Sequence, residues 1–218
     1  DNLIWYGRFI AYAGAYQDAI DFYSEGIAQF PTDARLYRHR GHRYISTRQF
    51  DKAIADFEKA ASLREGMENE IEPDGMPNAR NIPVSTLHGN IFYHLGLAHY
   101  LKGDQKAALA AYLKSLEASR MDDNLVSNTH WLYMINRRLG NEKAALEVLS
   151  PISTDLDIIE NTAYQNLSLF YKGELNEEEL TASANGALSS NDAVNYGLGN
   201  WYLANGDSTK AISIFEEI

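Results

Sequence analysis

The sequence predicts an all-α protein in which about six antiparallel helix pairs stack into a right-handed α-solenoid. Three observations predict this fold: residues of the same type recur 34 positions apart, glycines recur at a similar spacing, and apolar residues between them follow a helical period. Periods of this length are typical of repeat arrays, because one helix pair cannot bury its apolar face alone and stacks on the next pair.

The first two copies show the recurrence most clearly. Small residues return at small positions and aromatic residues at aromatic positions: Gly7, Ala19, Tyr23 and Gly26 recur as Gly41, Ala53, Phe57 and Ala60. In the second copy, the apolar residues form a stripe at helical spacing and the charged residues lie off it. We expect the small residues to let neighbouring helices approach closely, while the aromatic residues fill the remaining space.

This pattern resembles the tetratricopeptide repeat, W-x2-L-G-x2-Y followed by A-x3-F and P. The matching positions are Gly7, Ala19-x3-Tyr23 and Pro31; Gly41 and Ala53-x3-Phe57; Leu95-Gly96 and Ala108-x3-Tyr112; and, in a late copy, Leu198-Gly199-x2-Tyr202 with Ala211-x3-Phe215. A weaker copy has Leu132 and Ala145-x3-Leu149, with Tyr133 where the glycine is expected. The resemblance implies one helical hairpin in each copy.

Glycines at the turns between paired helices give a second measure of the period. Gly103, Gly140, Gly173 and Gly206 follow one another at intervals close to one repeat, and Gly14 has the same place in the first copy. This spacing predicts six helix pairs. The fifth pair, at about residues 156–190, is degenerate, because its 176–179 segment has no alanine at the expected position.

The second and third copies are separated by an insertion at residues 65–88 within one predicted solenoid domain, 1–218. The interval from Gly41 to Gly96 exceeds that from Gly7 to Gly41 by more than half. The insertion is acidic in its first half, and its prolines and the Pro73–Gly75 turn forbid a continuous helix. We expect residues 81–85 to pack back on the solenoid. The insertion is either functional or a solvated acidic loop, and it lacks the spacing of a calcium-binding loop.

Composition and motifs exclude several classes of function. The net charge of −11 argues against nucleic-acid binding, and the absence of cysteine excludes disulfides and thiolate metal sites. No apolar run is long enough to span a membrane. No phosphate-binding loop, nucleophile elbow or zinc-protease motif is present. His39 and His42 lie close together on one predicted helix, but ordinary surface histidines are the preferred interpretation. We expect no enzyme activity, cofactor or metal.

The candidate binding residues come from an arginine-rich segment on this acidic chain. Five arginines fall between residues 35 and 48, and a helical period places Arg35, Arg38 and His42 on one face. The family resemblance implies that the first helix of each pair lines a concave groove that holds an extended peptide. Its expected peptide-binding residues are Arg8, Tyr12, Arg35, Arg38, His42, Tyr93, Tyr100, Asn128, His130, Arg137 and Arg138.

Guanidinium groups suit carboxylates and phosphates, so the groove would take an acidic segment or a C-terminal carboxylate. The alternative is that these arginines pair with Glu and Asp on adjacent helices. The family's chaperone-binding carboxylate clamp is not matched, since its lysine and asparagine positions hold Ile4, Arg8, Arg38, His42, Tyr93 and Leu97. A chaperone partner is therefore not implied.

The first functional hypothesis is a bacterial protein-interaction scaffold, soluble and either periplasmic or secreted, that binds an acidic or C-terminal peptide. The second is a receptor for a small anionic ligand, with the insertion as a lid and a closed pocket walled by residues 76–84. An unrecognised enzyme is third. The chain stops inside a helix without a polar cap, so Ile212, Phe215 and Ile218 should meet another chain, as in a homo-oligomer, or the natural protein continues.

Overall fold

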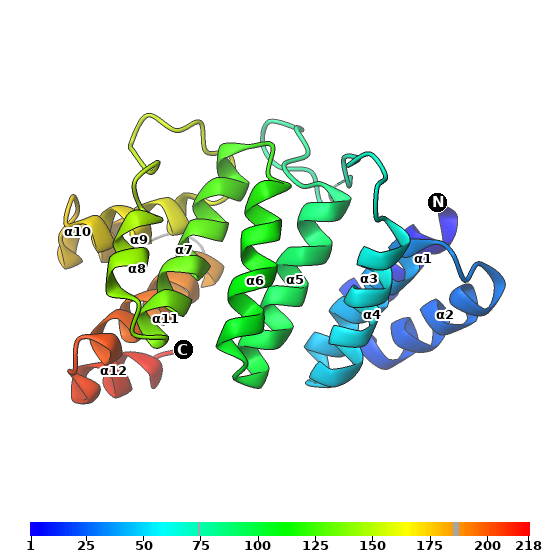
Figure 1. Cartoon of the computed structure of the whole chain (residues 1–218), viewed down its shortest axis with the longest axis horizontal. Helices are drawn as coiled ribbons and strands as arrows, with labels where there is room; N and C mark the ends of the chain where they lie inside the picture. The colour runs from blue at the N-terminus through cyan, green and yellow to red at the C-terminus, as the bar shows by residue number, and fades with distance from the viewer. Residues whose placement is uncertain (74, 185–187) are drawn as a thin grey trace. The chain divides into compact units, whose positions relative to one another are not determined.

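The computed structural model describes residues 1–73, 75–184 and 188–218. These residues form α-helices and no β-strand, which confirms the all-α prediction. The helices are α1 (Asn2–Tyr12), α2 (Tyr16–Gln29), α3 (Ala34–Ser46), α4 (Phe50–Leu63), α5 (Leu87–Lys102), α6 (Gln105–Glu117), α7 (Asp122–Arg138), α8 (Glu142–Glu147), α9 (Thr162–Lys172), α10 (Glu177–Ser183), α11 (Leu188–Ala204) and α12 (Ser208–Phe215) (Figure 1). They follow one another as six helix pairs. None of these helices is long and apolar enough to cross a membrane.

The chain divides into two compact units. The first contains residues Asp1–Arg120 with α1 to α6, and the second contains Met121–Ile218 with α7 to α12. Each unit holds three helix pairs and is described below by itself. That the two units together make one solenoid domain stays a prediction.

In the first unit, the repeated glycine of each first helix lies against the repeated aromatic ring of its partner helix. The pairs are Gly7 with Tyr23, Gly41 with Phe57, and Gly96 with Tyr112. A Cβ at Gly41 would lie 3.0 Å from the Phe57 ring, and one at Gly96 would lie 2.6 Å from the Tyr112 ring. The repeat pattern therefore records a steric requirement: a small residue is needed where an aromatic ring fills the space between two helices.

The turns between paired helices use a left-handed backbone residue. Gly14 and Gly103 have φ angles of 83° and 89°, and the later turn glycines behave alike. In the second pair the place equivalent to Gly14, one repeat later, is occupied by Arg48, whose φ is 58°. Glycine adopts this conformation without steric cost, whereas arginine does not. The hairpin geometry is therefore kept even where the residue that favours it is missing.

In the fourth copy, which lies in the second unit, a large residue replaces the usual glycine and a smaller residue replaces the usual aromatic residue. Tyr133 replaces the usual glycine, and its ring stacks on Tyr171 with centroids 4.1 Å apart. The position that is aromatic in other copies is the smaller Leu149, and both Tyr133 and Leu149 are buried. The last pair returns to the usual arrangement, since a Cβ at Gly199 would lie 2.5 Å from the Phe215 ring.

The degenerate fifth pair is held by polar anchors. In α10, Asn176 and Glu179 form a capping box, which explains the unusual sequence at the expected alanine. Upstream, the buried carboxylate of Asp123 accepts hydrogen bonds from three successive backbone amides, those of residues 159–161. Part of the predicted 156–190 repeat, residues 185–187, lies outside the described residues.

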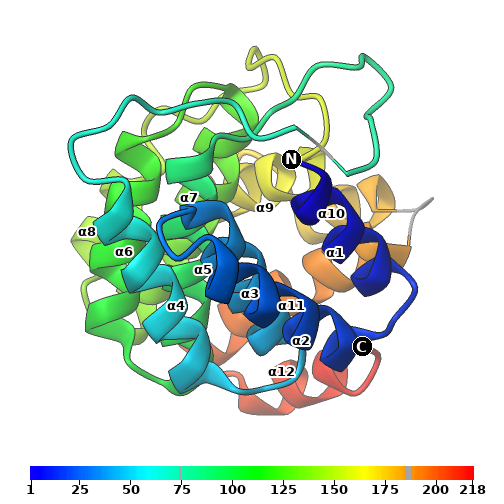
Figure 2. The same ribbon diagram turned by 90° about the vertical axis from the view of Figure 1, so that its right-hand side faces the viewer.

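The insertion leaves α4 after Leu63 and returns at α5 without a helix among its described residues (Figure 2). Its two arms meet through an isolated antiparallel bridge between Ile71 and Thr86. Val84 is buried, so the prediction that residues 81–85 pack back on the helices is confirmed at that residue, while Ile82 is 39% exposed. The predicted turn at Pro73–Gly75 includes Asp74, which lies outside the described residues.

Candidate functional site

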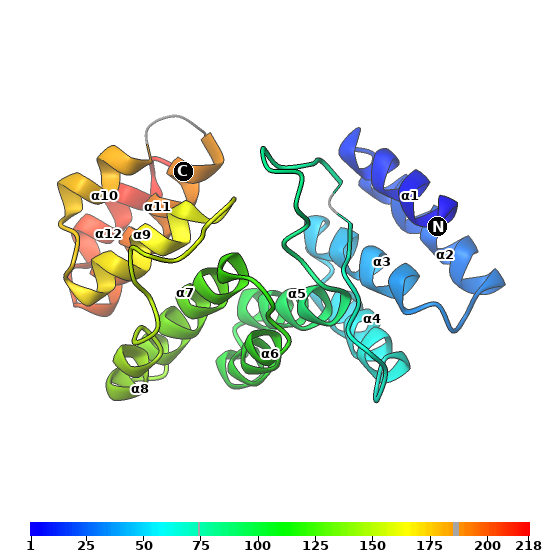
Figure 3. The same cartoon turned by 90° about the horizontal axis from the view of Figure 1, so that it is seen from above.

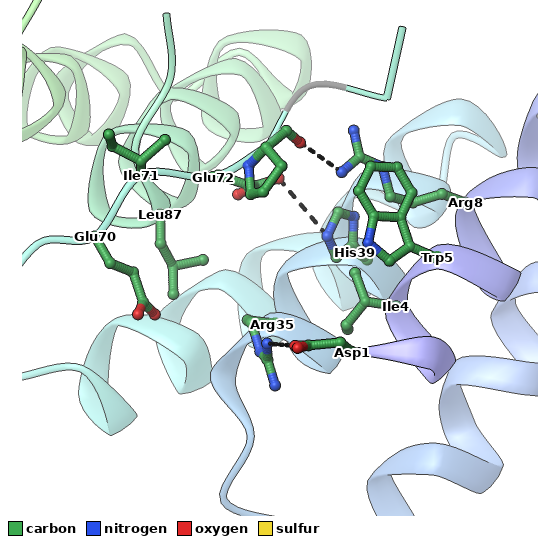
Figure 4. A pocket seen from close by; sticks show the side chains of 11 residues that line it. Asp1, Ile4, Trp5, Arg8, Arg35, His39, Glu70, Ile71, Glu72 and Leu87 are labelled. Atoms are coloured by element: carbon green, nitrogen blue, oxygen red, sulfur yellow. Dashed lines mark hydrogen bonds and ion pairs between the residues drawn. The ribbon is translucent and has the colours of Figure 1, made fainter. Parts of the chain in front are cut away.

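The arginines of α3 are divided among separate environments. Arg38 forms an ion pair with Glu72 of the insertion, with Nη2 and Oε1 2.9 Å apart, and both side chains are about nine-tenths buried. Arg35 lies apart from this pair and bonds Asp33 of its own helix cap and Asp1 (Figure 4). Arg38 and His42 are in contact, at 3.4 Å, whereas Arg35 is bound to other partners. Of these two arginines, Arg35 is the more exposed and Arg38 is buried.

Arg40 points to the other side of α3 and is part of the helix packing. Its guanidinium donates two hydrogen bonds, at 2.8 and 2.7 Å, to the carboxylate of Asp56 on α4, and a third to the Ser24 hydroxyl. Burial raises the pKa of Asp56, although the bonds from Arg40 act against this. Arg40 thus follows the alternative interpretation of the arginine run, in which arginines pair with acidic residues of adjacent helices.

The remaining cationic side chains gather around a hollow in the first unit, which we call the cationic hollow. Its volume is about 90 Å³. Its lining residues come from α1, α2 and α3: Arg8, Ala11, Tyr12, Tyr23, Arg38, His39, His42 and Arg43. Three guanidinium groups therefore meet in one small space of a chain whose net charge is −11.

His39 is buried and His42 is half-buried, which corrects the prediction of ordinary surface histidines. His39 stacks on Tyr23 with ring centroids 5.8 Å apart, and His42 packs on His94 of α5 at 4.3 Å. Burial, with the nearby arginine charges adding to it, lowers the pKa of His39 well below its usual range. Burial likewise lowers the pKa of His94 to about 3, so these rings are neutral at pH 7.

The electrostatics of the hollow are dominated by like charges. Burial, followed by the neighbouring charge of Arg38, lowers the pKa of Arg43. Arg43 lies over the ring of Tyr16, and no carboxylate among the described residues pairs with it. Glu72 is the carboxylate that the described part of the chain brings to the arginines of the hollow. The three arginines of the hollow therefore carry more positive charge than the carboxylates of the described residues neutralise.

The insertion, whose loop runs between α5 and α1 in Figure 3, contacts α1 and α3 at the hollow through neighbouring residues. Glu72 pairs with Arg38 and lies 3.6 Å from His39 Nε2. The Pro73 carbonyl accepts a hydrogen bond from Arg8 Nη1 at 2.7 Å. A Cβ at Gly75 would meet the hydroxyl of Tyr12. Backbone and side-chain oxygens of the insertion thus already act as acceptors for the arginines.

Beside the hollow is a larger opening, the outer cleft, of about 290 Å³. Figure 4 shows Trp5 and Arg8 of α1 facing residues 70–73 of the insertion across it. The complete lining is Asp1, Ile4, Trp5, Arg8, Arg35, His39, Glu70, Ile71, Glu72, Pro73 and Leu87. A pocket walled by residues 76–84 was predicted; in this cleft the wall is residues 70–73, because the first arm of the insertion lies next to α1.

The other predicted residues of the first unit differ in accessibility. Tyr12 is 52% exposed and Tyr93 is half-buried, so both are accessible to a partner. Tyr100 is only 3% exposed, and we therefore remove it from the candidate surface. A buried ring at the end of α5 supports packing and presents no surface to a peptide.

The predicted residues of the second unit lie on α7, where Asn128 and His130 are internal, Arg137 is half-buried and Arg138 is exposed. Asn128 and His130 are 2% and 1% exposed, because α7 packs against α8, α9 and α11. Burial lowers the pKa of His130 to about 3, and its ring stacks on Tyr171. Arg137 bonds the Tyr133 hydroxyl and the Ala204 carbonyl, and Arg138 bonds Asn200. These side chains connect helices of the second unit, and we remove Asn128 and His130 from the candidate surface.

Sequence reasoning missed several residues of the site. His39 and Arg43 belong to the arginine-rich segment and follow the predicted residues Arg38 and His42 directly. Because they are four residues apart on one helix, they lie on the same face, and this spacing could have identified them. Glu72 and Pro73 carried no such signal. They reach the arginines only through the path of the insertion, which the repeat pattern does not specify.

Comparisons with known proteins agree with this architecture. The tetratricopeptide-repeat family model matches residues 34–66 and 89–120, which are the second and third helix pairs. The small glutamine-rich tetratricopeptide repeat-containing protein 2 of Saccharomyces cerevisiae is 32% identical over 102 residues, 47% of this chain and 23% of that protein. The Hsp70-Hsp90 organizing protein of Triticum aestivum is 28% identical over 113 residues, 52% of this chain and 16% of that protein. The chain thus spans less than a quarter of the length of either relative.

Solved structures show the same fold over nearly the whole chain. YrrB, described as a tetratricopeptide-repeat protein with an unusual peptide-binding site, has a TM-score of 0.53 at 18% identity, covering 98% of this chain and 90% of that one. Kinesin light chain repeats of Podosopora anserina have a TM-score of 0.58 at 14% identity, covering 99% and 91%. The family model, the six helix pairs and the recurring contact between glycine and an aromatic ring show that the chain contains tetratricopeptide repeats, and these solved structures share its fold.

Proposed function

We propose that this chain is a non-enzymatic protein-interaction scaffold whose first unit binds an acidic peptide segment at the cationic hollow and the outer cleft. One observation carries the proposal: Arg8, Arg38 and Arg43 line one small hollow, and Glu72 is the single carboxylate that the described residues supply to them. The family match and the fold support a role in binding proteins. The acidic character of the partner rests on this charge arrangement.

The net charge of −11 does not prevent this attraction. At physiological salt, exposed charges more than about 8 Å apart are largely screened, so the nearby arginines decide the local potential. Hydrogen bonds between a guanidinium and a carboxylate are charge-assisted and contribute on the order of 1.5–3 kcal/mol each when well formed. Partly buried arginines suit this task, because less water competes for them.

The outer cleft gives the peptide a second kind of contact. Ile4 and Leu87 are buried in its wall, and Trp5 lies against Arg8 with the guanidinium carbon 4.6 Å from the ring centroid. An apolar side chain next to the acidic residue of a partner would pack on these groups. The combination favours a segment with a carboxylate and a neighbouring apolar residue over a purely acidic run.

The proposal is tested by measuring the binding of an acidic peptide library by fluorescence anisotropy. Arg43→Gln is the most informative variant, since Arg43 leaves no carboxylate of the described residues unpaired. Arg48→Gln is the matched control: it makes the same charge change at an exposed residue of the same helix pair. We expect Arg43→Gln to weaken binding by about tenfold, and added salt to weaken binding to the unaltered protein.

Equal affinities of the Arg43 and Arg48 variants would contradict the proposal. Arg38→Ala is less suitable, because it leaves the buried Glu72 without its partner and thereby mixes binding with folding. Arg40→Ala is also unsuitable as a neutral control, because Arg40 holds Asp56.

A second candidate function is favoured by the position of the insertion. Because residues 72, 73 and 75 lie against Arg38, Arg8 and Tyr12, the insertion could act as a lid over a small anionic ligand. The two functions differ in how affinity depends on ligand length. Affinity that rises as an acidic peptide is extended supports the scaffold, and affinity that is complete for a single small anion supports the receptor.

A further inference from the structure

The charges at the cationic hollow are out of balance. Three guanidinium groups line it, and the carboxylate of Glu72 offsets one of them. The imidazoles of His39 and His94 add no charge at neutral pH, because their pKa values are lowered. Within the described part of the chain, two positive charges therefore stay uncompensated around a space of about 90 Å³.

The hollow also contains a donor without an acceptor. Arg38 is 6% exposed, and its Nε has no hydrogen-bond partner among the described residues. On the other side of the ion pair, Oε2 of Glu72 is likewise buried, and no described residue donates to it. A buried donor that stays unpaired costs about 1–3 kcal/mol. The contact between the insertion and the hollow thus leaves polar atoms without hydrogen-bond partners among the described residues. An additional acceptor in the hollow would give Arg38 Nε a partner.

We infer that the cationic hollow binds a doubly charged phosphoryl group, carried by a phosphorylated side chain of the acidic partner segment. This inference rests on the proposed function and names the chemistry of its central contact. A phosphomonoester carries a charge of about −1.5 to −2 at pH 7 and three acceptor oxygens. It therefore matches both the two uncompensated charges and the number of guanidinium groups, whereas a carboxylate matches neither.

The geometry of the lining supports the same ligand. Guanidinium groups present planar pairs of donors that fit phosphate oxygens. Arg8 reaches the hollow from α1, while Arg38 and Arg43 reach it from α3, so donors approach one centre from two helices. Tyr12, bonded by Arg8 Nε at 3.2 Å, adds a hydroxyl donor. The volume accepts one small oxyanion and excludes a nucleotide base from the same space.

The test compares three versions of an acidic peptide selected in the first experiment, with serine, glutamate or phosphoserine at one position. We expect the phosphoserine peptide to bind about tenfold more tightly than the glutamate peptide. The preference should disappear in Arg43→Gln and Arg8→Gln and persist in Arg48→Gln. Melting curves of all variants show whether the first unit is folded. Inorganic phosphate should compete with the phosphoserine peptide.

The pH dependence of affinity gives a second measurement, because titration of a phosphoryl ligand and titration of the protein change the affinity in opposite directions. The titratable and charged groups that face the hollow or pack against it are Arg8 and Tyr12 of α1, Tyr23 of α2, Arg38, His39, His42 and Arg43 of α3, His94 of α5 and Glu72 of the insertion. Protonating the histidines would make the hollow more positive and strengthen anion binding. A phosphomonoester loses its second charge near pH 6. Affinity that falls between pH 7.5 and about 5 for the phosphoserine peptide alone therefore supports the inference.

The outcomes separate the two proposals. Equal affinities for the glutamate and phosphoserine peptides, both dependent on Arg43, would overturn the phosphoryl inference and leave the acidic-peptide scaffold intact. Binding of inorganic phosphate that depends on Arg43, without binding of any peptide, would support the phosphoryl hollow and contradict the scaffold. A preference for phosphoserine that survives Arg43→Gln and Arg8→Gln would place the phosphoryl group elsewhere and overturn the inference.

Discussion

Replacing Glu72 with glutamine should change stability and anion affinity in opposite directions. Glu72→Gln keeps the size of the side chain and removes its negative charge from the ion pair with Arg38, in which the two side chains are 10% and 7% exposed. If the carboxylate both holds the insertion on the hollow and lies beside the place of an anionic ligand, its loss must destabilise the first unit and also make anion binding tighter. A purely structural ion pair would produce the first effect alone.

The loss of stability follows from burial. Removing one partner of a buried ion pair typically costs about 3–5 kcal/mol. Glutamine keeps an amide oxygen that can accept from Arg38, so we expect about 1–3 kcal/mol. For a unit of this size, with about 4 °C per kcal/mol, the melting temperature should fall by roughly 4–12 °C.

The gain in affinity follows from repulsion. Two negative charges about 6 Å apart, at an effective dielectric constant of about 20, repel by roughly 3 kcal/mol before screening. Removing this repulsion should tighten anion binding by at least about tenfold. The assay is thermal melting in phosphate-free buffer and in a phosphate series, because a ligand that binds the folded state raises the melting temperature with its concentration. The fluorescence of Trp5, which lies in the outer cleft, reports binding independently.

Glu70→Gln is the matched control for this experiment. Glu70 lies two positions earlier in the insertion, is 55% exposed and pairs with Arg64 at 3.2 Å. Its loss makes the same charge change outside the hollow, so we expect little effect on melting or on the phosphate response. If Glu72→Gln melts earlier but gains no more from phosphate than Glu70→Gln, Glu72 is structural and does not lie beside a ligand position.

Three further predictions concern the fold. Asp123→Asn should destabilise the second unit by about 2–4 kcal/mol in urea unfolding, because its carboxylate accepts hydrogen bonds from three backbone amides. Asp122→Asn affects one such bond and should cost less than half as much. Equal losses of stability would contradict the anchoring role of Asp123. Arg48→Gly should stabilise the first unit by about 0.5–1 kcal/mol by relieving the left-handed backbone, after the greater freedom of glycine in the unfolded chain is subtracted; a destabilised variant would show that the side chain of Arg48 matters more than its backbone. Gly41→Leu should cost about 1–3 kcal/mol by overpacking Phe57, and a melting temperature within a degree of the unaltered protein would refute the repeat register.

The fold could be predicted from the sequence because its determinants are local and periodic. Gly41 and Phe57 belong to the two helices of one hairpin, so their small and aromatic characters are imposed by a contact within the repeat. The turn glycines are fixed by backbone conformation in the same local way. Even the departure at Tyr133 was visible in the sequence. Its compensation by Leu149 became interpretable once both residues were seen to be buried.

The site could be predicted only in part, because its decisive contacts are not periodic. A helical period of about 100° per residue separates Arg40 from Arg38 by about 200°, and the two side chains do lie on different sides of α3. It could not show that Arg38 is buried, since burial comes from Glu72 of the insertion, which lies beyond the whole of α4 in the chain. His130 failed for a related reason. The groove position implied by the family pattern becomes internal here, because α7 packs against three other helices of the second unit.

The insertion and the hollow are coupled electrostatically, because Glu72 of the insertion pairs with one of the arginines that line the hollow. Three guanidinium groups in a partly buried space repel one another, and this repulsion adds to burial in lowering the pKa of Arg43. Some negative charge must therefore accompany the folded first unit, either from Glu72 or from a bound anion. A bound anion repels the nearby carboxylate of Glu72, and the Pro73 carbonyl then competes for Arg8 with a stronger acceptor. Ligand binding should thus weaken the attachment of residues 72 and 73. On addition of phosphate, amide hydrogen exchange should rise in this segment and fall in α3. Slower exchange in both would contradict this prediction and indicate that the insertion closes over the anion.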